Sequence, residues 1–207
     1  MSAAHWYRVI ASGYHAVVTF VPVTLMFPYE ISLHQSRKSR LLDPVPPNIW
    51  SKYDGVYVDG TDKFEHWQRR RPSAAADMVS LIRDIASYAR AQRKDFLLIP
   101  QNGDGLLGDS QFLETVDGFA REDLLYGETE PEVRNTPASI SESVRRMRPL
   151  VAAGKPVLVI EYTSDPALAA SMLREIKALG FIGYAASREL KMLSPPAFGC
   201  GQPDCSR

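Results

Sequence analysis

Cysteine is scarce in this chain of 207 residues, and neither sign of charge is in excess. The two cysteines, Cys200 and Cys205, lie near the C-terminus. Two cysteines cannot build a disulfide scaffold, and they are too few to hold a structural zinc alone. Lys and Arg total 24, as do Asp and Glu, so the basic excess typical of a dedicated nucleic-acid-binding protein is missing. The apolar fraction of 45% is enough for a packed core and excludes wholesale disorder.

Long apolar runs are also missing, which argues against a membrane span. The longest run, residues 16–27, contains Pro22 and is shorter than the ~20 residues that a transmembrane helix requires. The run could be the apolar part of a signal peptide. However, Pro28, Tyr29 and Glu30 follow it, where a cleavage site of small residues would be expected. We therefore favour a buried strand or helix here, and the sequence leaves the localisation open.

From residue 53 onward, apolar runs typical of strands alternate with patterns typical of helices. The predicted strands are residues 55–59, 96–100, 116–121, 156–160 and 181–184. The predicted helices are residues 74–92 after Ser73, 137–153 after Thr136, and a helix that starts after Asp165 and ends at Gly180. Continuous apolar strands followed by amphipathic helices indicate an α/β fold with a parallel sheet. An open doubly wound sheet and a (β/α) barrel both fit this pattern.

Polar side chains follow several of the predicted strands. Asp59, Asn102, Glu122 and Glu161 each come after an apolar run. In both architectures the carboxyl ends of the strands carry the ligand site, so we expect these four side chains to share one rim. Two carboxylates on one rim suit glycoside hydrolysis, in which one carboxyl is protonated and the other ionised. A solvated loop residue or a helix cap is the alternative for each of them alone.

Negative charge is concentrated near the proposed rim. Residues 101–133 contain nine Asp and Glu, whereas Arg121 is their only Lys or Arg. This imbalance predicts an acidic face that would attract a cationic substrate; a solvated acidic loop is the alternative. Trp67, Tyr126 and Tyr162 could stack against sugar rings, although core packing would also account for them.

Two short motifs look like nucleotide or phosphate sites but lack the necessary context. Residues 103–108 read as GxGxxG, yet the long helix of a dinucleotide fold does not follow, and the loop is acidic. Residues 59–61 are similar to the end of the DxDGT phosphatase motif. Tyr57 occupies the place of the nucleophilic aspartate in that motif, so we reject this interpretation as well.

Four further segments carry a family resemblance in their order and spacing. They are residues 53–59 (YDGVYVD), 64–67 (FEHW), 101–103 (QNG) and 116–122 (VDGFARE), the last followed by Leu125 and Tyr126. Together they resemble glycoside hydrolase family 114, the endo-α-1,4-polygalactosaminidases. Residues 157–162 and 180–184 are similar to the closing strands of that family. The resemblance implies a (β/α)8 TIM-type barrel that acts as a hydrolase without a metal or an organic cofactor.

The resemblance also implies roles for individual residues. Asp59 would be the nucleophile or ion-pair carboxylate, and Glu122 would be the acid/base. The residues expected to bind substrate are Asn102, Trp67, Tyr126, Tyr162 and Glu161. Asp54 lies at the start of its strand, so we interpret it as structural. The implied substrate is a partly deacetylated galactosamine polysaccharide, which is cationic and agrees with the acidic segment.

The N-terminal part departs from the family pattern. Only about five parallel strands are recognisable, so the barrel is predicted to be partial. We divide the chain into an atypical N-terminal segment (1–47), a barrel-type catalytic domain (48–194) and a flexible tail (195–207). Residues 16–27 could supply one or two substitute strands.

Two other functions stay open at this point. A sugar-binding or degenerate barrel would bind the polymer without cleaving it. An unrelated α/β enzyme could instead use Asp59 and Asp62 as Mg²⁺ ligands, because one or two carboxylates plus water suffice for that ion.

Overall fold

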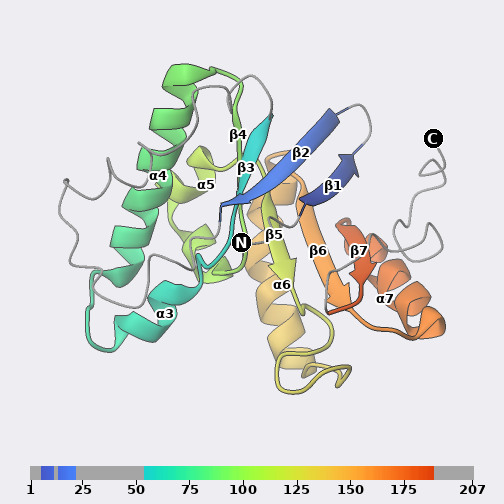
Figure 1. The fold of residues 1–207 in the computed structure, drawn as a ribbon. Helices are drawn as coiled ribbons and strands as arrows, with labels where there is room; N and C mark the ends of the chain where they lie inside the picture. The colour runs from blue at the N-terminus through green and yellow to red at the C-terminus, as the bar shows by residue number, and fades with distance from the viewer. Residues whose placement is uncertain (1–5, 12–13, 22–53, 189–207) are drawn as a thin grey trace, which may run out of the picture. The chain divides into compact units, whose positions relative to one another are not determined.

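The computed structural model describes residues 6–11, 14–21 and 54–188. The chain divides into two compact units, Met1–Asp117 and Gly118–Arg207, which we call the first and second unit. Each unit is described by itself (Figure 1). Cys200, Cys205 and the predicted tail boundary at residue 195 lie outside the described residues.

The first unit is built on a four-stranded sheet with the order β1-β2-β3-β4. The strands are β1 (Trp6–Ala11), β2 (Tyr14–Val21), β3 (Gly55–Val58) and β4 (Leu97–Pro100). β1 and β2 are antiparallel, whereas β2, β3 and β4 run parallel. The strand predicted within residues 16–27 corresponds in part to β2, and residues 22–27 lie outside the described residues. β1 falls where the sequence analysis predicted no strand.

The helices of the first unit follow β3 and β4. They are α3 (Lys63–Gln68), α4 (Ala74–Gln92), the short 3-10 helix η2 (Asp104–Gly108) and α5 (Ser110–Thr115). α4 has the predicted bounds, and its buried stripe includes Met78, Ile82 and Ile85. Ser73 occupies the predicted N-cap position, but its side chain makes no capping bond. Its hydroxyl instead lies 3.0 Å from Asp77 Oδ2.

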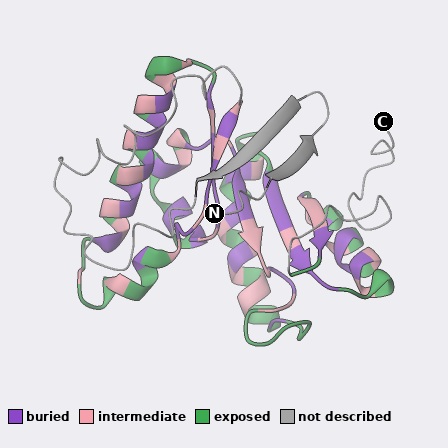
Figure 2. Cartoon of the chain, viewed as in Figure 1, coloured by how far each residue is buried: buried purple, intermediate pink, exposed green. Residues whose placement is uncertain are grey.

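The second unit is a three-stranded parallel sheet with the order β5-β6-β7. Its strands are β5 (Phe119–Glu122), β6 (Val157–Tyr162) and β7 (Ile182–Ala186), and its helices are α6 (Pro137–Ala152) and α7 (Pro166–Ala178). α7 packs against β6 and β7. Buried residues lie along the strands and on one side of the long helices (Figure 2).

The predicted ends of the second unit's helices are confirmed. Thr136 Oγ1 accepts a hydrogen bond from Ser139 N at 3.1 Å, and Asp165 Oδ1 accepts one from Ala167 N at 2.8 Å. Gly180, just beyond α7, has a φ of +83°, which a glycine adopts without strain.

All five predicted strands differ from the observed ones by one to three residues at an end. β5 begins at Phe119 rather than at residue 116, because Val116 is the C-cap of α5. β6 continues to Tyr162, so Glu161 lies inside the strand and not after it. The predicted α/β class with parallel strands is confirmed, and the described residues form two sheets rather than a closed eight-stranded barrel.

No helix within the described ranges combines the length and the apolar character needed to cross a membrane.

The close approach of β3 and β4 gives a stability prediction. A Cβ placed on Gly55 would lie 2.6 Å from both Leu97 Cβ and Leu97 O. The Gly55→Ala substitution should therefore force the two strands apart and lower the free energy of unfolding by about 1–3 kcal/mol. Urea denaturation measures this change.

Gly108 provides the matched control, because no atom lies within 4 Å of a Cβ placed there. Gly108→Ala should change the free energy of unfolding by less than about 0.5 kcal/mol. Equal unfolding free energies for the two variants would contradict the tight packing of β3 against β4.

Candidate active site

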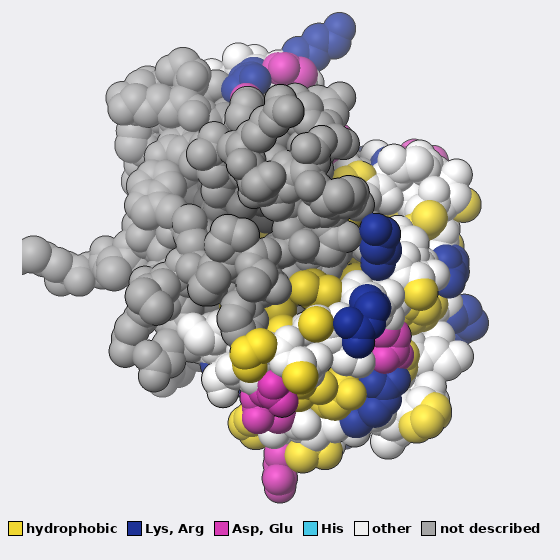
Figure 3. Space-filling model, turned by 90° about the vertical axis from the view of Figure 1, so that its right-hand side faces the viewer, with side chains coloured by type: hydrophobic (Ala, Val, Ile, Leu, Met, Phe, Trp, Pro, Cys, Tyr) yellow, Lys and Arg dark blue, Asp and Glu magenta, His cyan; other side chains and the backbone are white. Residues whose placement is uncertain are grey.

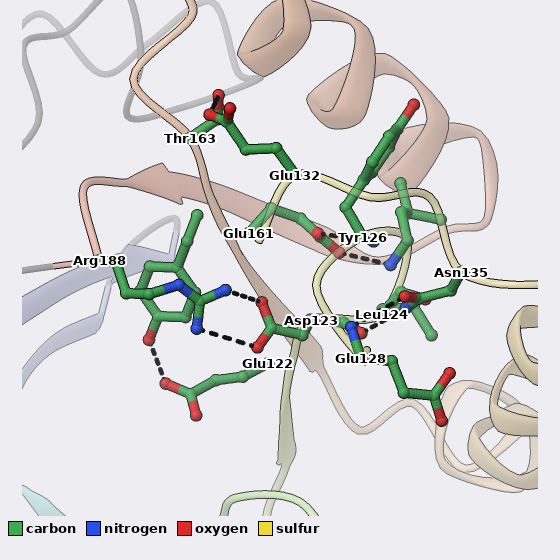
Figure 4. A network of polar contacts seen from close by, with 12 residues as sticks. Glu122, Asp123, Leu124, Tyr126, Glu128, Glu132, Asn135, Glu161, Thr163 and Arg188 are labelled. Atoms are coloured by element: carbon green, nitrogen blue, oxygen red, sulfur yellow. Dashed lines mark hydrogen bonds and ion pairs between the residues drawn. The ribbon is translucent and has the colours of Figure 1, made fainter. Parts of the chain in front are cut away.

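The carboxyl end of β5 carries Glu122, whose side chain is held by a tyrosine. Glu122 is half-buried and is the last residue of β5. The Tyr162 hydroxyl, at the end of the neighbouring strand β6, donates a hydrogen bond to Glu122 Oε1 (Figure 4). The parallel pairing of β5 with β6 brings the two strand ends together. Glu122 and Tyr162 therefore lie at one edge of this sheet.

Tyr162 is itself enclosed. Its side chain is only 7% exposed, and the guanidinium of Arg188 lies over its ring, 4.7 Å from the ring centre. Arg188 also forms an ion pair with the residue after Glu122: its Nη2 is 3.0 Å from Asp123 Oδ1, and its Nη1 is 3.4 Å from Oδ2. The hydroxyl of Tyr162 is thus directed at Glu122 by a ring that can move little.

Glu161 does not lie where the sequence analysis placed it. A substrate-binding position at the rim was expected, whereas its side chain is fully buried inside β6, with 0% exposed. Its Oε1 accepts a hydrogen bond from Leu125 N at 2.7 Å, and its Oε2 accepts one from Tyr126 N at 3.2 Å. Glu161 therefore fixes the loop that follows Glu122, and its burial removes it from direct contact with a substrate.

A buried asparagine completes the support of that loop. Asn135 is 7% exposed, and its Nδ2 donates to the carbonyl oxygens of Asp123 and Leu124 at 2.7 and 2.9 Å. Its Oδ1 accepts from Glu128 N at 2.9 Å. Each side-chain polar group of Asn135 has a backbone partner, so this residue replaces the hydrogen bonds that a regular strand would give the loop.

Tyr126, another predicted sugar contact, is half-buried in the same loop. Its ring lies beneath Arg134, with the guanidinium carbon 5.2 Å from the ring centre, and its hydroxyl is 3.2 Å from Arg134 Nη1. Arg134 also forms a two-pronged ion pair with Glu175 of α7, at 2.6 and 3.1 Å. Arg134 therefore links Tyr126 to α7.

In the first unit, Asp59 and Asn102 follow the paired strands β3 and β4. The hydroxyl of Thr61 joins the two strand ends, since it lies 2.5 Å from the carbonyl oxygen of Gln101 and 2.7 Å from that of Asn102. Gly103 has a φ of +70°, and a Cβ there would lie 3.0 Å from Thr61 O. Asp59 and Asn102, two of the four residues expected at one rim, therefore follow neighbouring parallel strands of the first unit.

The carboxylate of Asp59 is half-buried, and no group in the described part of the chain hydrogen-bonds to it. Trp67 lies on α3, eight positions after Asp59, and its half-buried ring meets His66 edge-on at 5.3 Å. Asp54, at the other end of β3, pairs with Arg93 at 2.9 Å, which agrees with the structural role predicted for it.

The acidic segment is more strongly neutralised than its sequence predicted. Asp109 caps α5, Asp117 pairs with Arg90, and Asp123 pairs with Arg188. On the face shown in Figure 3, acidic side chains stand among basic ones. The exposed acids of the second unit are concentrated instead in one loop, at Glu128, Glu130 and Glu132.

Comparison with known proteins places these features in a family. The sequence profile of glycoside hydrolase family GH114 matches residues 31–200. The chain belongs to family GH114. The resemblance found in the motifs is thereby confirmed.

Three curated relatives, each described as an uncharacterized protein, match the chain. They come from Deinococcus radiodurans (36% identical over 142 residues), Thermotoga maritima (34% over 153) and Methanocaldococcus jannaschii (31% over 177). The matches cover 68%, 68% and 78% of this chain and 45%, 46% and 50% of the relatives. The chain thus spans about half the length of the curated relatives it matches.

Among solved structures, the chain is similar to the glycoside hydrolase domain of PelA from Pseudomonas aeruginosa. The TM-score is 0.61 at 17% identity, and the match covers 77% of this chain and 63% of that domain's chain. At this level of identity the match shows a shared fold.

Sequence reasoning missed Arg188, Asn135 and Thr61 as residues that support the strand ends described above. Arg188 and its partner Asp123 are separated by 65 positions. Asn135 gave one detectable signal: it directly precedes the Thr136 cap of a predicted helix, where a polar residue commonly bonds to backbone.

The buried carboxyl of Glu161 gives a pH prediction. The pKa of Glu161 is raised to about 7, because desolvation by burial, together with the nearby Asp123, outweighs the backbone N–H donors that lower it. The folded protein therefore holds this proton more tightly than the unfolded chain. The stability that it contributes is present below about pH 4.5 and is lost as the pH rises through 7.

Glu161→Gln should remove this dependence. Between pH 4.5 and 7 the unfolding free energy of the wild type, relative to that of the variant, should fall by about 3 kcal/mol. Urea denaturation at several pH values measures both curves. Parallel curves would contradict a buried, titrating Glu161.

Proposed function

We propose that the chain hydrolyses a partly deacetylated, α-1,4-linked galactosamine polysaccharide by a two-carboxylate mechanism, with Asp59 and Glu122 as the pair. The observation that carries the proposal is the carboxylate of Glu122 at the end of a parallel strand, oriented by the hydroxyl of Tyr162. Membership in GH114 gives the reaction class. The motif resemblance gives the substrate class.

Glu122 suits the acid/base role. A general acid must come within hydrogen-bond distance of the glycosidic oxygen in a defined orientation. The half-buried carboxylate of Glu122 has one oxygen engaged by Tyr162, which fixes the direction of the group. The loop after it is fixed by Glu161 and Asn135, so the backbone that carries Glu122 is restrained as well.

Asp59 suits the role of the ionised partner. It follows β3 directly, and no hydrogen bond from the described residues restrains its carboxylate. An unengaged carboxylate can approach an anomeric carbon as a nucleophile, or can stabilise the positive charge that develops there. Asn102, on the adjoining strand end, offers an amide that can bind a sugar hydroxyl.

A cationic polymer fits the charge of the loop after β5. Glu128, Glu130 and Glu132 are all exposed there. Glu128 and Glu132 accept hydrogen bonds from the hydroxyls of Ser139 and Thr163, which do not neutralise a carboxylate. The loop therefore keeps its negative charge and would attract free amino groups of galactosamine.

Sugar binding without cleavage is the second candidate function. It is favoured by one observation: the described strands form two separate sheets rather than a closed barrel. Such a chain would bind galactosamine oligomers through Trp67, Tyr126 and the loop that carries Glu128, Glu130 and Glu132. It would release no product.

Substitution of the two carboxylates tests the hydrolase proposal. We expect Asp59→Asn and Glu122→Gln each to lower turnover by at least about 10²-fold, because each removes a group needed in the transition state. The measurement is mass spectrometry of the oligosaccharides released from partly deacetylated α-1,4-galactosaminan.

Two isosteric control variants serve this experiment. Asp54→Asn alters the opposite end of β3, and Glu142→Gln alters a partly exposed residue of α6; both should retain the wild-type rate. Full activity in Asp59→Asn and Glu122→Gln would contradict the assigned pair. Binding of oligomers by the wild type with no release would favour the second candidate.

A further inference from the structure

We infer that Arg188 is a positioning residue that holds Glu122 in its working orientation through Tyr162. The inference rests on the proposed function, in which Glu122 is the acid/base. Arg188 would act through two neighbours of Glu122. It contacts the ring that directs a hydroxyl at Glu122 and the carboxylate of the residue that follows Glu122 (Figure 4).

The first contact fixes the tyrosine ring. The guanidinium of Arg188 lies 4.7 Å from the centre of the Tyr162 ring, a geometry in which a cation is attracted to the face of an aromatic ring. The other surroundings of the ring are protein, since the side chain is 7% exposed. The cation covers the ring of Tyr162 and restrains the rotations that would carry the hydroxyl away from Glu122.

The second contact fixes the guanidinium and balances charge. Arg188 reaches Asp123 with two nitrogens, at 3.0 and 3.4 Å, and a two-pronged pair sets the plane of the guanidinium. Asp123 has a φ of +52°, so its backbone adopts a conformation that L-residues rarely choose. If Arg188 were absent, the carboxylate of Asp123 would lie next to Glu122 without the positive charge that Arg188 supplies.

In the loop after β5, Gly127 leaves space for the ion pair between Arg188 and Asp123. A Cβ on Gly127 would lie 2.5 Å from Asp123 Oδ1 and 3.0 Å from Arg188 Nη2, and its φ is +97°. A side chain at residue 127 would therefore displace both members of the ion pair. This close approach is independent of the ring contact and indicates that the loop is shaped around the pair of Arg188 and Asp123.

Lysine cannot substitute for arginine in this arrangement. A flat guanidinium can stack on a ring with its face while its edge binds a carboxylate in a fork, whereas an ammonium is a point charge. Arg188→Lys should therefore keep the charge near Asp123 but lose the restraint on Tyr162. The lysine variant separates positioning from simple charge neutralisation.

Steady-state kinetics on partly deacetylated galactosaminan test the catalytic consequence. We expect Arg188→Ala to lower kcat by about 10–100-fold, with KM close to the wild-type value, and Arg188→Lys to lie nearer to the alanine variant than to the wild type. In a Tyr162→Phe background, Arg188→Ala should add little, because the hydroxyl it directs is already absent. Arg145→Ala, which removes an exposed ion-paired arginine of α6, is the control and should leave both constants unchanged.

An NMR measurement tests the geometry without any activity. In protein carrying ¹³C-labelled tyrosine, the ring signals of Tyr162 are those absent from Tyr162→Phe. Arg188→Ala and Glu122→Gln should each shift these signals, whereas Arg145→Ala should not.

The outcomes separate the inference from the proposed function. No hydrolysis by the folded wild type would contradict the proposed function and, with it, a catalytic role for Arg188. If the wild type hydrolyses the polymer but the Tyr162 signals are unchanged in Arg188→Ala, the inference is contradicted and the proposed function stands. A raised KM with wild-type kcat in Arg188→Ala would also overturn the inference, because it would indicate direct contact with the substrate.

Discussion

The strand-end site of the second unit depends on the hydrogen bonds that the carboxylate of Glu161 accepts. This carboxylate is fully buried, and both of its oxygens accept backbone N–H groups from the loop after β5. A buried carboxylate without partners would cost several kcal/mol, so the loop and Glu161 stabilise each other. The same loop carries Asp123, which pairs with Arg188, and Arg188 covers the tyrosine that bonds to Glu122. A series of contacts thus connects the buried carboxylate of Glu161 to Glu122, the proposed acid/base.

The two proposed catalytic carboxylates differ in their surroundings in the way that two-carboxylate chemistry requires. Glu122 is held by a hydroxyl donor within a restrained network, while Asp59 follows β3 with no hydrogen bond from the described residues. Glycoside hydrolysis needs one group fixed for proton transfer and another able to meet the anomeric carbon. The chain belongs to GH114 and shares its fold with the hydrolase domain of PelA; the division of roles between the two carboxylates is our proposal.

Local patterns predicted the three long helices well but missed α3, η2 and α5; long-range contacts decided most of what else the sequence analysis missed. α4 and α7 were located from a buried stripe and a cap, which lie within a few residues of each other. β5 was started too early because Val116 is as apolar and buried as a strand residue, although it ends α5. Glu161 was placed at the rim because a carboxylate after an apolar run usually marks a strand end. Its backbone partners come from 36 and 35 positions away, and periodicity contains no information about them.

A crystal structure of the Glu122→Gln variant with a bound α-1,4-galactosamine oligomer would test the central claim most directly. The account predicts a glycosidic oxygen within about 3 Å of the residue 122 side chain, with Tyr162 still bonded to that side chain and Asp59 facing the anomeric carbon. Two results would contradict the proposed mechanism: an oligomer bound away from residue 122, or an oligomer bound there with Asp59 remote from the anomeric carbon.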